Sequence, residues 1–488
     1  MYVQHDPSSG TKLDGHPGAS VMVRIACDPP WARVLALPDP RVEGALIRAL
    51  TVVDNVGNDR CYYQTDKKRL PIGLLNRAVV ALNALTIGTE IAWEPALAGV
   101  FDESPMANGL VLRADQLDAL RAAETYRRGI IWGGTGYGKT LVIAGLARNH
   151  LAAKVLVLVE KRDLFGQLVR ELGELTGEKI GQVQGETWEP NRITVAMDQT
   201  LNNRIRGDAG IDWESSAYHL LASSEILILD EIHAHSNPTG MFLTALAKAP
   251  VRIGLSGTPF RDRDPLQWIR VEAMTGPILY KMRAGEMADR GLIPESEVWM
   301  VPWGSEDVHI VNRDWPECYE DGVVFCQKRN ATIATLAKRA IDTGRVPLIV
   351  FQRQDHGPVI QKILHGISGI TLPCVDGNAG TREREPIWRG LAAGTIKGAL
   401  SSMIVKQGLN LPAVNVIILA SARKANTEIV QVLGRGLRWK PAGADQKFYL
   451  LDLVDRHSPI LARHTDRRAS IWKREGYKVG IGVPAWLA

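Results

Sequence analysis

The octapeptide Gly133-Gly134-Thr135-Gly136-Tyr137-Gly138-Lys139-Thr140 is the stretch of this chain whose residue types and spacing best fit a chemical task. It matches the G-x-x-x-x-G-K-[ST] pattern of a phosphate-binding loop. The glycines let successive backbone N–H groups point at one centre, and the helix that follows adds its positive end. Lys139 would reach the terminal phosphates, and the Thr140 hydroxyl would ligate Mg²⁺. The pattern therefore predicts a site for a nucleoside triphosphate.

Two predicted elements position this loop. The apolar run Gly129–Trp132 directly before it indicates a buried strand, and Leu141–Ala147 directly after it indicates a helix. Strand, glycine-rich loop and helix in that order form the setting in which such a loop binds phosphates. A chance match is the alternative, since the chain has 46 glycines, but the Lys-Thr pair and the flanking elements argue against it.

A second candidate group is the acidic pair Asp230 and Glu231, which ends the apolar run Ile226–Leu229. Ligands of open α/β sheets bind at the carboxyl ends of the strands, where this pair would lie. Asp230 would hold Mg²⁺, so Thr140 and Asp230 are the predicted metal residues. Glu231 would orient or deprotonate the attacking water. A pair of solvated loop acids is the alternative interpretation.

The apolar runs indicate an α/β protein. From about Leu110, runs rich in Val, Ile and Leu alternate with helical segments, which is typical of parallel sheets covered on both faces. The strand candidates are Val155–Val159, Ile193–Ala196, Ile226–Leu229, Val251–Leu255, Val346–Phe351, Ile370–Leu372, Gly398–Ser401, Val414–Leu419 and Phe448–Leu451. The first four runs form one series and the last five a second, and the two series predict two lobes. The prolines between Gly276 and Arg329 indicate the joint.

A smaller unit precedes the lobes. Val21–Cys27 and Glu90–Trp93 are strand-like, and Val42–Leu50 and Gly73–Leu85 are helical, which predicts a small N-terminal α+β domain. We identify no chemistry in it. We expect an accessory domain at residues 1–105, a first, nucleotide-binding lobe at 106–290 and a second lobe at 291–488.

Bulk composition narrows the classes of function. The 488 residues are 45% apolar and 23% charged, as in an ordinary globular protein. No run of about 18 apolar residues occurs, so no membrane span is expected. The N-terminus lacks the basic and apolar regions of a secretory signal. Five cysteines without a C-x-x-C pair predict neither a disulfide framework nor a zinc site, and a reducing cytoplasm is the expected compartment.

The charge is unevenly distributed. From Gln327 to Ala488 the chain has 25 Lys and Arg against 11 Asp and Glu, although the net charge of the whole chain is only +5. The rest of the chain is therefore acidic. A basic lobe joined to an acidic remainder predicts a polyanionic partner, and a solvated basic face is the alternative.

The phosphate loop followed by Asp230-Glu231-Ile232-His233 resembles superfamily 2 helicases of the DExH type. Further segments resemble that family's motifs, in the family's order, between about Leu110 and Leu453. They are Leu112-Arg113-x-x-Gln116, Val157–Arg162, Ala196–Leu201, Ser256-Gly257-Thr258-Pro259, Ile349-Val350-Phe351, Gln407–Pro412 and Gln431-x-x-Gly434-Arg435-x-x-Arg438. Asn410 departs from the pattern, since the family more often has Asp there.

The resemblance implies two RecA-like parallel-sheet lobes in tandem, with ATP and Mg²⁺ bound between them. It implies that Gln116 reads the adenine and that Gly408 and Gln431 contact the nucleotide. Val157–Arg162 and Ala196–Leu201 would touch the nucleic-acid backbone. Ser256–Pro259 would couple the state of the nucleotide to the grip on the strand.

Arg435 and Arg438 are the candidates for completing the cage around the transferred phosphoryl group, beside the catalytic Lys139, Asp230 and Glu231. They follow a helical run, Glu428–Leu433, and can face the same cleft if the helix continues, since they are three residues apart. An arginine that meets the transition state can raise the rate by about 10³–10⁵. Nucleic-acid contact or a surface ion pair is the alternative for both.

Other groups give weaker indications. Trp132 is expected in the strand core rather than as a base stacker, and Phe101 either covers an adenine ring or makes a core contact. His233 and His235 lack the four-ligand set of a structural metal site. The terminal cluster either follows a phosphate backbone or forms a solvated helix face. Its members are Arg463, Arg467, Arg468, Trp472, Lys473, Arg474 and Tyr477.

A narrower resemblance is to phage-encoded helicases of the UvsW type. It rests on Lys328-Arg329-Asn330, Asp355-His356-Gly357, Arg468–Val479 and Leu70-Pro71-x-Gly73-Leu74. It favours DNA, as a single strand or a forked duplex, and the host cytoplasm if the chain is phage-encoded. The sequence thus predicts an ATP-dependent DNA helicase or translocase. The alternatives are a remodeller that does not unwind, the motor subunit of a restriction or defence assembly, an RNA helicase, or a nucleotide-gated binding module.

Overall fold

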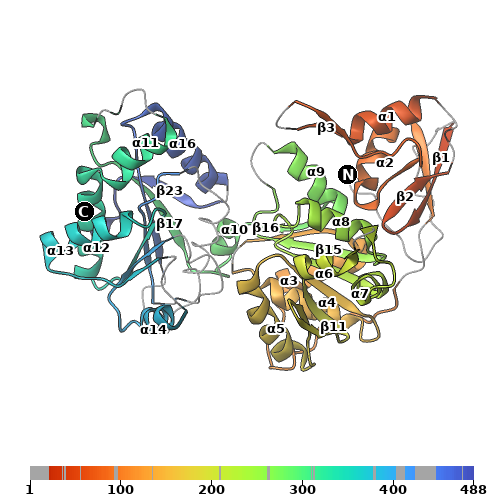
Figure 1. Cartoon of the computed structure of the whole chain (residues 1–488), viewed down its shortest axis with the longest axis horizontal. Helices are drawn as coiled ribbons and strands as arrows, with labels where there is room; N and C mark the ends of the chain where they lie inside the picture. Colours follow the sequence, from red (N-terminus) through yellow and green to blue (C-terminus); the bar gives the residue numbers. More distant parts are fainter. Residues whose placement is uncertain are drawn as a thin grey trace. The chain divides into compact units, whose positions relative to one another are not determined.

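The computed structural model describes residues 21–35, 37, 40–54, 57–92, 97–134, 136–207, 210–260, 264–308, 310, 314–376, 381–402, 411, 413–423, 447–474 and 476–487 (Figure 1). Two compact units make up the chain. The first comprises the residues up to Gly133 together with Gly138–Lys281, and the second comprises Gly134–Tyr137 together with Met282–Ala488. The expected domain limits at 105/106 and 290/291 stay predictions.

The N-terminal part of the first unit is a small α+β layer, drawn in red and orange in Figure 1. Its four-stranded sheet has the order β5-β2-β1-β6, with β1 parallel to β6 and antiparallel to β2. The elements are β1 Val21–Asp28, β2 Trp31–Val34, α1 Pro40–Leu50, β3 Thr51–Val53, β4 Asp59–Cys61, β5 Arg69–Pro71, the 3₁₀ turn η1 Ile72–Leu74, α2 Leu75–Asn83 and β6 Ile87–Ala92.

The core of this layer continues into helix α9 of the nucleotide-binding lobe. Ile269 and Ala273 of α9 belong to its buried cluster. A Cβ on Gly73 would lie 2.1 Å from the Glu272 carbonyl oxygen, so only glycine allows this close approach. Arg77 also pairs with Glu272. The accessory layer and the lobe therefore pack as one body.

The lobe that follows is built on an eight-stranded sheet of order β10-β9-β11-β8-β14-β15-β7-β16. Its strands β9, β11, β8, β14, β15 and β7 pair in parallel. The strands are β7 Arg128–Gly133, β8 Val155–Val159, β9 Gly181–Gln184, β10 Thr187–Glu189, β11 Ile193–Met197, β14 Ile226–Asp230, β15 Val251–Ser256 and β16 Ile278–Met282. A two-stranded ribbon, β12 Arg206–Gly207 and β13 Gly210–Ile211, is separate from this sheet.

The central strands of this sheet are buried because helices cover it; all five residues of β8, for example, are buried. The helices are α3 Ala114–Tyr126, α4 Lys139–Asn149, α5 Arg162–Thr176, α6 Asp198–Ile205, α7 Ser216–Ser223, α8 Pro238–Leu246 and α9 Pro265–Met274. The strands predicted in this half of the chain are confirmed, and the sheet gains β9, β10 and β16.

The second unit holds a seven-stranded parallel sheet of order β19-β20-β18-β21-β22-β17-β23. The strands are β17 Ser296–Val301, β18 Pro347–Phe351, β19 Cys374–Val375, β20 Ala399–Ser402, β21 Val416–Leu419, β22 Phe448–Leu453 and β23 Lys478–Ile481. The helical elements are α10 Ala284–Asp289, η2 Ser305–Asp307, α11 Trp315–Tyr319, η3 Glu320–Val324, α12 Gln327–Asp342, α13 His356–Ser368, α14 Thr381–Ala392, α16 Pro459–Arg474 and η4 Ala485–Leu487.

One expectation for the second unit was wrong in detail. The predicted strand Ile370–Leu372 is not a strand, and the pairing occurs instead at β19, two residues long. The segment Gly276–Arg329, where the joint was expected, contains the boundary between the two units after Lys281. The same segment also holds β17, which lies between β22 and β23 inside the sheet. Pro294 and Pro302 flank this strand without interrupting it, because a proline just outside a strand removes no ladder hydrogen bond.

Within the described ranges, no helix combines the length and the apolar character needed to cross a membrane.

Candidate nucleotide site

The predicted phosphate loop leaves the end of β7 and enters α4. Gly136 and Gly138 have φ values of +85° and +84°, a region that residues with a Cβ rarely adopt. A Cβ on Gly134 would lie 2.9 Å from the backbone nitrogen of Ala284. The loop therefore needs glycine for its conformation at two positions and for space at a third. Tyr137 is buried, and Thr135 lies outside the described residues.

Gln116 lies against this loop. A Cβ on Gly138 would meet the Gln116 Nε2 atom at 2.6 Å, so the two residues are in close contact. Gln116 is buried on the first turn of α3, and its Oε1 accepts a hydrogen bond from the Arg113 backbone nitrogen at 3.0 Å. This hydrogen bond caps the start of α3 and holds the Gln116 side chain beside the phosphate loop.

Lys139 and Glu231 form an ion pair at the ends of α4 and β14, with 3.1 Å between Nζ and Oε1. Burial opposes both charges, but Lys139, helped by His233, holds the pKa of Glu231 below its usual value. Glu231 and Asp230 in turn raise the pKa of Lys139. Glu231 is therefore ionised near neutral pH and can accept a hydrogen bond from a water molecule. Its φ of +51° is a strained conformation for a residue with a side chain.

Asp230 is in a different electrostatic state from its neighbour. Burial, followed by the charge of Glu231, raises the pKa of Asp230 to about 6. Its Oδ1 accepts a hydrogen bond from the Glu231 backbone nitrogen at 3.1 Å. The other predicted metal residue, Thr140, donates its hydroxyl proton to Glu171 Oε2 at 3.0 Å. Glu171 of α5 is a partner that the sequence reasoning missed.

The Ser256 hydroxyl connects the acidic pair to the end of β15. It donates to Glu231 Oε2 at 3.1 Å and accepts from the Thr258 backbone nitrogen at 3.0 Å. His233 Nδ1 lies 2.8 Å from the Ser256 hydroxyl oxygen. With its one proton given to Glu231, the hydroxyl must accept from His233, which fixes a proton on Nδ1. The predicted coupling segment Ser256–Pro259 thus touches the predicted water-activating residue.

The pattern of these groups fits a nucleoside triphosphate with Mg²⁺. One lysine and the positive end of a helix suit phosphate oxygens. The Thr140 hydroxyl and the Asp230 carboxylate are the hard oxygen ligands that Mg²⁺ takes. Four predicted contacts, Gly408, Gln431, Arg435 and Arg438, lie outside the described residues, so their roles stay predictions.

The residues that gave weaker indications in the sequence lie in different surroundings. Trp132 is half-buried in β7, and its indole nitrogen donates to the Gly257 carbonyl at 2.8 Å. Phe101 is partly exposed and lies under the Arg121 guanidinium, 5.5 Å from the ring centre. His235 is buried against α6 and the end of β14.

The terminal cluster is only partly a surface. Arg468, Trp472 and Tyr477 are buried, so the interpretation of these three as nucleic-acid contacts is wrong. Arg468 binds both carboxylate oxygens of Asp452 through Nε at 2.9 Å, and Trp472 donates to Asp452 Oδ2 at 3.0 Å. Helix periodicity alone could not reveal this, because the buried acid lies on β22. Arg463, Lys473 and Arg474 are exposed.

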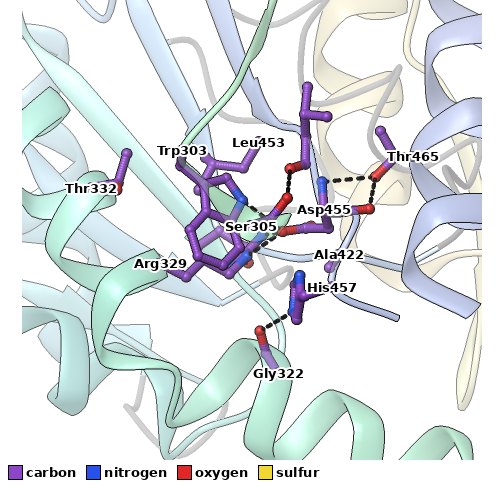
Figure 2. Close-up of polar contacts among 12 residues, drawn as sticks. Trp303, Ser305, Gly322, Arg329, Thr332, Ala422, Leu453, Asp455, His457 and Thr465 are labelled. Carbon is purple, nitrogen blue, oxygen red and sulfur yellow. Dashed lines mark hydrogen bonds and ion pairs between the residues drawn. The ribbon is translucent and has the colours of Figure 1, made fainter. Parts of the chain in front are cut away.

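A second buried pair lies beside the first in the same unit. Arg329 of α12 donates to both carboxylate oxygens of Asp455, which also accepts from the Trp303 indole (Figure 2). Figure 2 also shows Thr465 at the Asp455 backbone. Burial would raise the pKa of Asp455, but Arg329 and then Arg468 hold it below its usual value. The arginines of the narrower phage-type pattern therefore hold the second sheet to its helices.

A phosphate loop after one strand, an acidic pair after another strand of the same parallel sheet, and a second parallel sheet define a P-loop protein with two α/β units. Residues 109–261 match the family described as type III restriction enzyme, res subunit, and residues 323–440 match the helicase conserved C-terminal domain. The chain belongs to the superfamily 2 helicases.

Two relatives have related sequences. The DNA 3'-5' helicase XPB of Mycobacterium tuberculosis is 26% identical over 341 residues, which cover 68% of this chain and 59% of that protein. The DNA 3'-5' translocase XPB2 of Sulfurisphaera tokodaii is 23% identical over 384 residues, which cover 71% and 82%. The chain thus spans less than two thirds of the first relative's length.

A solved structure with a TM-score above 0.5 shares the fold. The ATP-dependent type ISP restriction-modification enzyme LlaBIII bound to DNA aligns with a TM-score of 0.54 and 15% identity, over 77% of this chain and 31% of that one. The structure of T4 UvsW aligns over 95% of this chain and 99% of that one, with 17% identity and a TM-score of 0.44.

Proposed function

We propose that this protein is an ATP-driven DNA helicase or translocase, in which hydrolysis at the Lys139–Glu231 site drives movement on DNA. The observation that carries the proposal is the partly buried ion pair of Lys139 and Glu231, linked through Ser256 to the end of a further strand. Phosphoryl transfer needs positioned charge more than covalent chemistry, and this cluster supplies both signs of charge.

Each residue has a proposed role. Lys139 neutralises the terminal phosphates, and Glu231 orients the attacking water and accepts its proton. Thr140 and Asp230 would hold Mg²⁺, which would supply positive charge against the negative charge that develops during phosphoryl transfer. Gln116, whose side chain lies beside Gly138, recognises the adenine ring.

Nucleic acid is proposed to run over the carboxyl ends of the strands of the first lobe. There the segments Val157–Arg162 and Ala196–Leu201 enter helices α5 and α6. DNA is favoured because the relatives XPB and XPB2 are named as a DNA helicase and a DNA translocase. The surplus of positive charge from Gln327 onward supports a polyanion of either kind.

A second candidate is the motor subunit of a restriction or defence assembly. It is favoured by the match of residues 109–261 to a restriction-enzyme subunit family. Both candidates need the same ATPase, and they differ in whether DNA cutting by a partner depends on it. Co-purification of a nuclease whose cutting needs ATP would favour the assembly.

The test is ATP hydrolysis without polymer and with single-stranded DNA, duplex DNA, forked DNA or RNA, alongside strand displacement on the same substrates. We expect DNA to stimulate hydrolysis more than RNA does. Lys139→Ala is the control and should be inactive throughout. Greater stimulation by RNA than by DNA would indicate an RNA helicase. Stimulation by DNA without strand displacement would indicate a translocase. If no polymer stimulates hydrolysis, the proposal is rejected.

A further inference from the structure

His235 is buried at a junction of three elements in the first unit. Its Nε2 lies 2.9 Å from the backbone oxygen of Asp230 at the end of β14. Its Nδ1 lies 3.3 Å from Oδ2 of Asp198, the first residue of α6. The side chains of His235 and Asp198 are 0% and 4% exposed, so water cannot replace either contact. One imidazole ring therefore spans from α6 to the acidic pair.

The surroundings hold this ring in place. The His235 backbone nitrogen donates to the Ile232 carbonyl at 3.1 Å. Helix α8 packs so closely that a Cβ on its Gly240 would lie 2.0 Å from the His235 carbonyl oxygen. Asp198 is fixed as well, because its Oδ1 accepts from the Gln199 backbone nitrogen at 2.7 Å. A shift of α6 would move Asp198 and would therefore change its contact with His235.

The two partners of the His235 ring are both hydrogen-bond acceptors. A carbonyl oxygen and a carboxylate only accept hydrogen bonds, so both ring nitrogens of His235 face acceptors. Nε2 donates to the Asp230 carbonyl, and Nδ1 lies beside the Asp198 carboxylate without an aligned hydrogen bond. Metal binding does not explain the arrangement, since the described residues contain no group of three or more His, Cys, Asp or Glu able to hold a metal ion. The neighbouring His233 faces Ser256 instead.

We infer that His235 is a positioning residue that couples α6 to the metal-holding carboxylate, so that nucleic acid bound at α6 adjusts Asp230. This inference rests on the proposed function. The strand order places β8 between β11, which leads into α6, and β14, so the imidazole is a side-chain link across two strand positions. A misplacement of about 1 Å at a reacting centre can cost about 10² in rate, so a small shift at Asp230 is sufficient.

The test compares ATP hydrolysis by the full chain and its His235→Gln variant, without polymer and with saturating single-stranded DNA. Gln can still donate to the Asp230 carbonyl but does not reach Asp198. We expect hydrolysis without DNA and affinity for DNA to stay within about twofold, whereas stimulation by DNA falls by about tenfold, in the range of typical coupling effects. His219→Gln, on the exposed part of α7, is the matched control and should change nothing.

A second variant, Asp198→Asn, removes the charge from the other end of the link. If the two side chains act together, the double variant should lose no more stimulation than His235→Gln alone. Should His235→Gln fail to fold, Asp198→Asn by itself must reduce the stimulation. Thermal unfolding of each variant identifies a folding defect.

The outcomes separate the inference from the proposed function. A parent protein that no polymer stimulates would reject the proposed function. A stimulated parent with an equally stimulated His235→Gln variant would overturn only the inference. A loss that is equal with and without DNA would also overturn it, because His235 would then only support the site.

Discussion

Glu231 differs from its neighbour Asp230 because only Glu231 has Lys139 and Ser256 as direct partners. Those partners hold the pKa of Glu231 low, whereas burial raises that of Asp230. Two adjacent carboxyl groups thus acquire different states from their surroundings. This difference suits one residue to water and the other to a metal ion.

Glu231→Gln should bind ATP and hydrolyse it at least about 10²-fold more slowly, since the amide cannot accept the proton of the attacking water. The charge on Lys139 remains, so nucleotide affinity should change little. Equilibrium binding of ATP and single-turnover hydrolysis, measured on the same preparation, check this. A collapse of ATP affinity with unchanged turnover would show that Glu231 has another role.

Hydrolysis should fall as the pH drops below about 6 when Mg²⁺ is scarce. The pKa of Asp230 is raised to about 6, so the proton competes with the metal below that pH. A metal ion favours the ionised carboxylate, so saturating Mg²⁺ should move the fall to lower pH. Rate–pH profiles at low and high Mg²⁺ check this. If the two profiles coincide, the titration of Asp230 does not limit metal binding.

At the scale of elements, the second sheet is tied to its helices by two buried ion pairs. Arg468 of α16 reaches Asp452, and Arg329 of α12 reaches Asp455. All four side chains are 0% exposed. Their loss is costly because removing one partner leaves the other charged and buried.

Arg468→Ala should therefore lower the free energy of unfolding by about 3–5 kcal/mol, the usual cost of breaking a buried pair. The exposed Arg463 on the same helix gives the matched control, and Arg463→Ala should cost less than about 0.5 kcal/mol. Denaturant unfolding of the three proteins compares them. Equal stability of the two variants would mean that the buried pair contributes nothing.

The elements show what could be predicted from the sequence. Runs such as Val155–Val159 were placed correctly because a short continuous run of Val and Leu favours a buried strand. β17 was missed because Pro294 and Pro302 beside it indicate a loop, and they outweighed the alternation of its residues. The predicted catalytic residues Lys139, Asp230 and Glu231 are close in sequence to strand ends, so their positions could be predicted. The contacts Thr140–Glu171 and His235–Asp198 join different elements, and only the fold brings them together.

At the scale of the whole molecule, positive charge is concentrated from Gln327 onward. DNA affinity should accordingly fall steeply with salt, because each neutralised phosphate releases counterions. Binding of single-stranded DNA, measured between about 50 and 200 mM salt, should give a straight line of negative slope on logarithmic axes. A flat plot would exclude a footprint dominated by phosphates.

The central claim is that a nucleic-acid-driven ATPase needs both lobes: the Lys139–Glu231 site of the first and the predicted arginines of the second. Single-turnover ATP hydrolysis with saturating single-stranded DNA tests it most directly. We expect Arg438→Ala to lower that rate by about 10³-fold or more with little loss of nucleotide affinity, since such an arginine acts mainly in the transition state. Arg435→Ala should act in the same direction. If both variants keep the parent rate, hydrolysis is a property of the first lobe alone and the claim is wrong.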